Sequence, residues 1–182
     1  EVPALEWIIR RNAFWDIFYE HCNYFTLQSL TSIFGNTKSG LLFGDQYLYV
    51  LADLHSLRKT ISGARSTTPS ALTSLQTEIN NHKGFVEQHK GLLIWGAGAK
   101  GSTFVNITDP DRQNITAVVD INPKKIGRYI ALTGHFIISP DQIALTGVRK
   151  ILVMNENYVD EIKDLLASMG LGNFTLFTLG LM

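Results

Sequence analysis

The sequence predicts an α/β protein whose second half is a small Rossmann-like domain built on a parallel sheet. Residues 92–95 form a short apolar run, typical of a strand that is buried on both faces. Gly96, Gly98 and Gly101 follow it in the pattern G-x-G-x-x-G, which indicates a strand that turns into a helix beneath a nucleotide. From there, segments with strand and helix character alternate to residue 177, which favours a parallel sheet with helices on both faces.

The composition narrows the class of protein and of partner. The chain has 182 residues, of which 45% are hydrophobic and 18% are charged, enough for one large domain or two small ones. Sixteen basic residues balance sixteen acidic ones, so there is no general attraction to nucleic acid or membranes. The single cysteine, Cys22, cannot form an internal disulfide, which suits a cytoplasmic protein.

The first 60 residues mix several short elements. Apolar residues at helical spacing predict the first helix, and the aromatic-rich stretch after it follows neither a helical nor a strand period. In order, we expect a helix at 4–14, a structured loop at 15–25, a helix from Leu27 to Phe34 capped by Thr26 and ended by Gly35, a turn at 36–40, and a hairpin with strands 41–43 and 46–52 around Gly44-Asp45.

Residues 61–90 are expected to be a linker followed by a connecting helix. Residues 61–70 are rich in Ser, Thr and Gly, and Thr68 and Pro69 fit the cap and first position of a helix that ends at Gly91. One face of this helix carries Leu72, Leu75, Ile79, His82 and Val86. His82 and His89 are interpreted as surface or boundary histidines, and no metal site is expected.

Residues 91–182 supply the alternating elements of the Rossmann-like domain, whose binding crevice should lie at the carboxyl ends of its strands. Its length is too short for both halves of a full dinucleotide fold. After the first strand we expect a helix at 102–107, strands at 115–120 and 136–138, a helix at 140–145, a strand at 150–154, a helix capped by Asn157 with Gly170 past its end, and a strand at 174–177.

Charged residues near the glycine turn are candidates for nucleotide contacts. Asp120 ends the second strand 19 residues after Gly101, where a dinucleotide site places the acid that binds a ribose hydroxyl. A strand-end acid that caps the turn before Asn122 is the equal alternative. Lys100 is either a phosphate contact or a solvated lysine. Three further bases, Lys124, Lys125 and Arg128, are either diphosphate contacts or ordinary surface charges.

Glu20 and His21 are the second place where chemistry is expected. A histidine titrates near neutral pH, and a nearby carboxylate can orient it or stabilise its protonated form. Composition alone favours a partly buried histidine with a structural role.

Three ordered segments make the chain recognisable. Residues 19–26, Tyr-Glu-His-Cys-Asn-Tyr-Phe-Thr, resemble the E-H-x-x-Y-F-S/T signature of sugar C-methyltransferases that use S-adenosylmethionine. Residues 43–50 resemble a second segment of those enzymes. Residues 96–101 together with 119–129 are similar to their C-terminal nucleotide-binding-type domain.

The resemblance implies both a domain arrangement and a reaction. Residues 1–60 would be the C-terminal α/β remnant of a class I methyltransferase domain, and a nucleotide-linked keto-sugar would lie between the two domains. His21 would be the general base and Glu20 its catalytic partner. Removing the proton beside the ketone gives an enolate that attacks the cofactor's methyl group. The expected nucleotide- or substrate-binding residues are Gly96, Gly98, Lys100, Gly101, Asp120, Lys124, Arg128 and Tyr24.

Two departures from the family bear on activity. Phe18 stands where family members often have a tyrosine, so any hydroxyl role there is absent or belongs to Tyr19. The chain begins at Glu1 without an initiator Met, a glycine-rich cofactor loop or a cysteine-rich zinc module. We therefore expect a piece of a longer protein whose missing N-terminal part binds most of the S-adenosylmethionine, and which is inactive alone. The alternatives are a non-catalytic module that binds NAD or another nucleotide, and a purely structural α/β domain.

Overall fold

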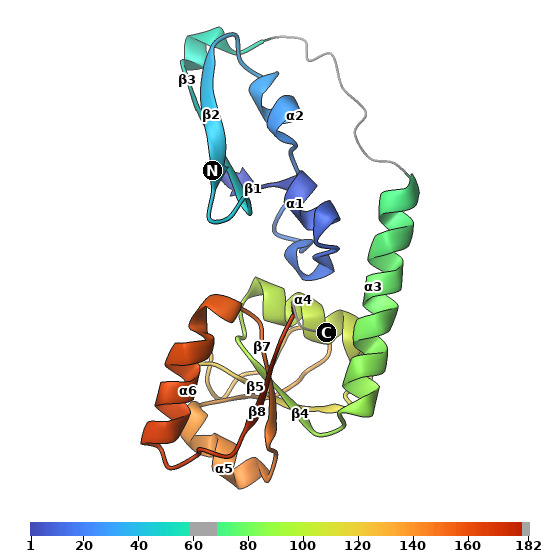
Figure 1. Ribbon diagram of the computed structural model, residues 1–182, viewed down its shortest axis with the longest axis vertical. Coiled ribbons are helices and arrows are strands. Elements are labelled where there is room, and N and C mark those ends of the chain that lie inside the picture. The colour runs from blue at the N-terminus through green and yellow to red at the C-terminus, as the bar shows by residue number, and fades with distance from the viewer. Residues whose placement is uncertain (59–68, 180–182) are drawn as a thin grey trace. The chain divides into compact units, whose positions relative to one another are not determined.

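The computed structural model describes residues 1–58 and 69–179, and these form two compact units, Glu1–Glu78 and Ile79–Met182. The division falls within helix α3 (Pro69–Gln88), inside the segment that the sequence assigns to the connection (Figure 1). The predicted cap Thr68 and most of the predicted linker lie outside the described residues. In the part that is described, no helix combines the length and apolar character needed to cross a membrane.

The first unit is a three-stranded antiparallel sheet with short helices. Its strands lie in the order β1-β3-β2. Leu48 of β3 and Ile8 of α1 are fully buried and form part of the unit's core. The elements are β1 (Val2–Pro3), α1 (Leu5–Arg10), the 3₁₀ helix η1 (Phe14–Asp16), α2 (Leu27–Thr31), β2 (Thr37–Leu42), β3 (Tyr47–Ala52) and the 3₁₀ helix η2 (Leu54–Ser56).

The predicted helix after Thr26 begins where the sequence indicates and ends early. Thr26 and Ser29 form a reciprocal capping box, in which Ser29 N–H donates to Thr26 Oγ1 at 3.0 Å. The predicted end at Gly35 is wrong, because α2 stops at Thr31. The backbone N–H of Gly35 donates to the Ser56 carbonyl at 2.8 Å instead of continuing the helix.

The predicted turn at 36–40 is also wrong, because β2 already begins at Thr37 and pairs with β3 in the register Thr37↔Ala52 to Leu42↔Tyr47. Tertiary pairing outweighs the turn chemistry of this stretch. A Cβ on Gly40 would come within 2.7 Å of Tyr49 Cε1, so the tyrosine ring covers this glycine. The hairpin connection spans residues 43–46, with Phe43, Gly44 and Asp45 at φ values of 52°, 63° and 70°.

The second unit confirms the predicted Rossmann-like architecture. Its five strands run parallel in the order β6-β5-β4-β7-β8. The order reverses between β4 and β7, which makes this gap the topological switch point of the sheet. The elements are β4 (Leu92–Trp95), α4 (Ala99–Thr108), β5 (Ile115–Val119), β6 (Ile137–Ile138), the 3₁₀ helix η3 (Pro140–Gln142), α5 (Ile143–Thr146), β7 (Lys150–Val153), the 3₁₀ helix η4 (Glu156–Tyr158), α6 (Val159–Ser168) and β8 (Thr175–Thr178).

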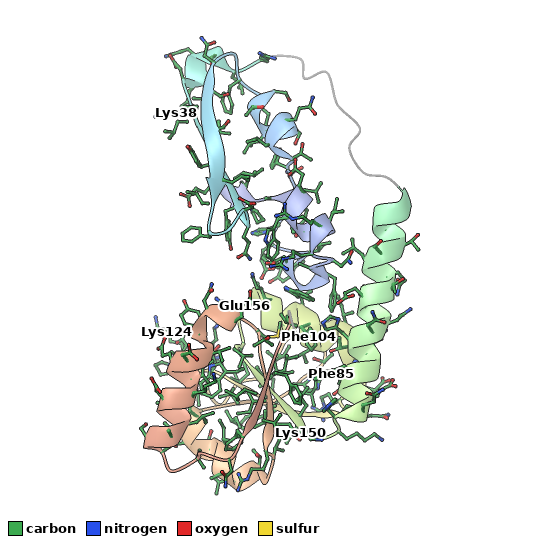
Figure 2. The ribbon with its side chains drawn as sticks, in the orientation of Figure 1. Lys38, Phe85, Phe104, Lys124, Lys150 and Glu156 are labelled. Carbon is green, nitrogen blue, oxygen red and sulfur yellow. The ribbon has the colours of Figure 1, made fainter. Side chains whose placement is uncertain are left out.

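Helices cover both faces of this sheet. One hydrophobic cluster joins the sheet to Ile143 of α5 and to Ile162 and Leu166 of α6. Phe104 of α4 is fully buried and meets the ring of His82, on α3, edge-on at 5.7 Å (Figure 2). His82 is only 1% exposed, so its interpretation as a surface or boundary histidine is wrong. The apolar face predicted for α3 is buried at His82 and Val86.

Two helix starts in this unit differ from the prediction. Helix α4 begins at Ala99, three residues before the expected Ser102, because the chain enters the helix directly from the glycine turn at Gly98. Asn155, and not Asn157, provides the cap after β7: its Oδ1 accepts from the Asn157 N–H at 3.2 Å. The predicted strands otherwise match the observed ones to within one residue at each end, the usual uncertainty of such boundaries.

Candidate functional site

A cavity of about 460 Å³ lies at the carboxyl edge of the parallel sheet, at the switch point between β4 and β7. Lys150 begins β7 and Glu156 follows the end of this strand, and the cavity lies at the Glu156 end (Figure 2). One wall comes from the glycine turn and α4, and the other comes from the end of β7 and from α6. The lining residues are Trp95, Gly96, Gly98, Ala99, Lys100, Gly101, Asp120, Ile121, Val153, Met154, Asn155, Tyr158, Glu161, Ile162 and Leu165.

The three glycines of the turn differ in conformation and in surroundings. Gly96 adopts a φ of 116°, a conformation that L side chains rarely adopt. A Cβ on Gly101 would overlap the carbonyl oxygen of Gly96, so the helix packs directly against the turn. No atom lies within 4 Å of a Cβ built on Gly98, so the backbone there is open to a ligand.

The N-terminus of α4 is suited to an anion. Gly98 is its N-cap residue and provides no side-chain hydrogen bond, and no acidic residue occupies the first turn. The first backbone N–H groups of a helix lack partners within the helix, and the helix dipole adds positive potential there. Lys100 lines the cavity from this same first turn.

Asp120 joins the glycine turn to the end of β5 and is only 8% exposed. Its Oδ2 accepts from the Ala97 N–H at 2.8 Å and from Lys125 Nζ at 3.2 Å, and its Oδ1 accepts from the Asn122 N–H at 2.8 Å. The capping role that the sequence offered as an alternative is therefore present. A carboxylate has about four acceptor positions, so the three bonds leave room for one ribose hydroxyl.

The structure separates the predicted basic residues. Lys124 and Arg128 do not line the cavity, and Arg128 Nε donates to the Lys124 carbonyl at 2.8 Å on an exposed loop (Figure 2). Lys125, by contrast, pairs with Asp120. The site therefore brings together the predicted residues Gly96, Gly98, Lys100, Gly101 and Asp120.

The wall formed by β7 and α6 was missed by sequence reasoning. It includes the apolar side chains of Val153, Met154, Ile162 and Leu165, and the exposed carboxylate of Glu161. No local motif marks these residues. The strand order could have indicated them, because the loop that follows the strand next to the switch point must border the crevice.

A small aromatic cluster surrounds His21 in the first unit. The His21 ring lies 4.2 Å from the Phe18 ring and 5.8 Å from the Tyr24 ring, measured between centroids. Its Nδ1 atom is buried and has no hydrogen-bond partner within the described residues. Glu20 is exposed, and no hydrogen bond joins it to His21 in that part of the chain.

Tyr24 holds the loop that carries His21. Its hydroxyl accepts from the Phe18 N–H at 2.9 Å and lies 3.2 Å from the Asp16 carbonyl. Partial burial, reinforced by the charges of Asp16 and Glu20, raises the pKa of Tyr24 above its ordinary value, although the Phe18 N–H acts in the opposite direction. The phenol therefore stays protonated at neutral pH and donates to the Asp16 carbonyl.

A buried pair of polar side chains lies beside the N-terminal end of β5. Asp109 and His135 are 2% exposed, and His135 Nε2 lies 3.1 Å from Asp109 Oδ2. Burial by itself raises the pKa of Asp109. The N–H groups of Ile115, Asn114 and Gln113, together with the His135 ring, outweigh burial and hold that pKa below its ordinary value. This pair fixes the loop between α4 and β5, and it lies outside the cavity at the glycine turn.

The family model that matches this chain falls within the second unit. The family described as C2185-like, N-terminal, matches residues 88–174. A solved structure of RSP, a Rex-family repressor, is 16% identical over 57% of this chain and 60% of its own, with a TM-score of 0.38. The chain thus spans less than two thirds of that repressor. No curated protein matches the chain.

Proposed function

We propose that the second unit binds a nucleotide, with its phosphate over Gly98 and the N-terminus of α4 and its ribose at Asp120. One observation carries the proposal: a single cavity at the switch point is lined by the open glycine turn, by Lys100 and by Asp120. Ligands of open parallel sheets bind at this place, outside the carboxyl ends of the strands.

The favoured nucleotide is one that carries a keto-sugar, because the sequence resembles the sugar C-methyltransferases. In this proposal the chain belongs to a cytoplasmic methyltransferase, and His21 removes the proton beside the ketone. The His21 ring is only partly buried, so Nε2, and not the buried Nδ1, would be the nitrogen that takes the proton. S-adenosylmethionine would supply the methyl group.

Within residues 1–58, the structure shows no glycine-rich binding loop for that cofactor. The glycines of this stretch, Gly35, Gly40 and Gly44, lie in a loop, within β2 and in the hairpin connection, and none follows a parallel strand. We therefore assign no cofactor-binding residue among residues 1–58. The alternative function is a non-catalytic module that binds NAD, which the glycine turn and Asp120 favour equally, but which leaves His21 unexplained.

Calorimetric titration of the folded chain tests nucleotide binding. We expect dTDP or NAD to bind, and we expect Lys100→Ala to weaken binding several-fold because the lysine is part of the cavity wall. Lys124→Ala is the matched control, since Lys124 is exposed outside the cavity and should leave the affinity unchanged. A folded chain that binds neither ligand would contradict the proposal.

Turnover of the longer protein that contains this chain tests the role of His21. We expect His21→Ala to lower turnover by about 10²–10⁴-fold, the usual contribution of a positioned base, with cofactor binding intact. His55→Ala is the matched control, because His55 is an exposed histidine of the same unit. Near-normal turnover of His21→Ala would remove His21 as the base.

A further inference from the structure

The two walls of the cavity differ in charge. The glycine-turn wall carries Lys100, whereas the wall formed by β7 and α6 carries Glu161. Asp120, at the end of β5, already pairs with Lys125. Lys100 and Glu161 thus give the two walls side chains of opposite charge.

The wall that carries Glu161 is mostly apolar. Val153, Met154, Ile162 and Leu165 present apolar surface to the cavity, and none of them offers a hydrogen-bond donor. Asn155 and Tyr158 line the same wall and offer donors. An anionic group against Glu161 would still face a like charge and would lose hydration over the apolar surface, whereas a group without negative charge would avoid the like charge.

We infer that Glu161 is a specificity residue, which selects nucleotides whose terminal phosphate is esterified to a second group without negative charge. This inference rests on the proposed nucleotide site. In it, the diphosphate lies at the glycine-turn wall and the second group lies against the apolar wall. Sugar nucleotides and dinucleotides meet this condition, whereas nucleoside triphosphates place another anion toward Glu161.

Calorimetry on the full chain with two ligand series tests the inference. One series is dTDP, dTTP and dTDP-glucose, and the other is ADP, ATP and ADP-ribose, so that either base can be recognised. We expect the triphosphate to bind no more tightly than the diphosphate. We expect Glu161→Gln to improve triphosphate binding relative to diphosphate binding by about fivefold, the size of one exposed like-charge interaction.

Asp160→Asn provides the matched control. Asp160 is the neighbouring acid in the first turn of α6, but it pairs with Lys163 and does not line the cavity. The ratio of triphosphate to diphosphate affinity decides the inference. If this ratio stays the same in Glu161→Gln, or changes equally in Asp160→Asn, the inference is overturned while nucleotide binding stays in place. If no ligand of either series binds the folded wild-type chain, the proposed function fails, and the inference fails with it.

Discussion

Replacing Gly101 by alanine should destabilise the second unit, although alanine is the better helix former. In the interior of a helix, Gly→Ala normally stabilises by up to about 1 kcal/mol. Here the new Cβ would overlap the carbonyl oxygen of Gly96, a backbone atom that no rotamer change can move. Overpacking of this kind costs about 1–3 kcal/mol, so after the gain in helix propensity the net change should be a loss of up to about 2 kcal/mol.

Relief of the overlap requires α4 to move away from the turn, which also disturbs the buried residues Phe104 and Val105 on that helix. Urea unfolding followed by circular dichroism measures the free energy of unfolding. Gly84→Ala is the matched control, because Gly84 lies within α3 with open space around its Cβ position. It should stabilise, so the two variants should shift in opposite directions. A Gly101→Ala variant as stable as Gly84→Ala would refute the steric argument.

Three further predictions concern stability. Asp109→Asn should lower the free energy of unfolding by about 1.5–3 kcal/mol, because the amide keeps one acceptor oxygen for the buried N–H groups but replaces the other by an N–H donor. Urea unfolding compared with that of Asp111→Asn, an exposed acid of the same loop, checks this. The pKa of Asp109 is lowered on folding, so its ionised carboxylate stabilises the folded state at pH values above the unfolded pKa of about 4. This stabilisation is lost as pH falls through the folded pKa. The free energy of unfolding of the wild type should therefore fall in acid by an amount that Asp109→Asn does not show. Thr26→Ala should cost about 1 kcal/mol through loss of the capping box, and a thermal melt that matches the wild type would contradict this.

The architecture of the second unit could be predicted because each of its elements is encoded locally. The apolar run 92–95, the glycine turn and the alternation of later segments each correspond to one observed element. The helix cap after β7 could not be predicted from local sequence in the same way. Both Asn155 and Asn157 are suitable capping residues, and only the end of β7 at Val153 decides that Asn155 accepts the hydrogen bond.

The first unit was harder to predict because its structure depends on pairing between distant residues. The stretch 36–40 contains turn-forming residues, but its pairing with Tyr49–Ala52 makes it a strand. The short strand β1 has no local signal at all, and it exists because Val2 and Pro3 pair with Leu48 and Tyr47. Non-local pairing of this kind cannot be read from the period of a short segment.

Only half of the candidate site could be predicted from the sequence, because only that half is formed by residues close together in the chain. The glycine-turn wall is a contiguous motif, and Asp120 follows it at a fixed spacing, whereas the α6 wall is brought to the cavity by the strand order. The predicted phosphate contacts Lys124 and Arg128 do not line the cavity, and Arg128 Nε instead donates to the Lys124 carbonyl within their own loop.

The glycine turn cannot separate the two proposed ligands, because a sugar nucleotide and NAD present it with the same diphosphate. The α6 wall can separate them, since the second group of NAD is a cationic ring and that of dTDP-glucose is neutral. If NAD lies against Glu161, Glu161→Gln should weaken NAD binding by about fivefold through the lost attraction. The affinity for dTDP-glucose should not change.

Titration of wild type, Glu161→Gln and Asp160→Asn with both ligands measures this difference. A loss confined to NAD in Glu161→Gln favours the non-catalytic module. Tight binding of dTDP-glucose with little or no binding of NAD favours the methyltransferase. If NAD and dTDP-glucose bind with equal affinity, and Glu161→Gln changes neither affinity, the α6 wall does not contact the second group of either ligand.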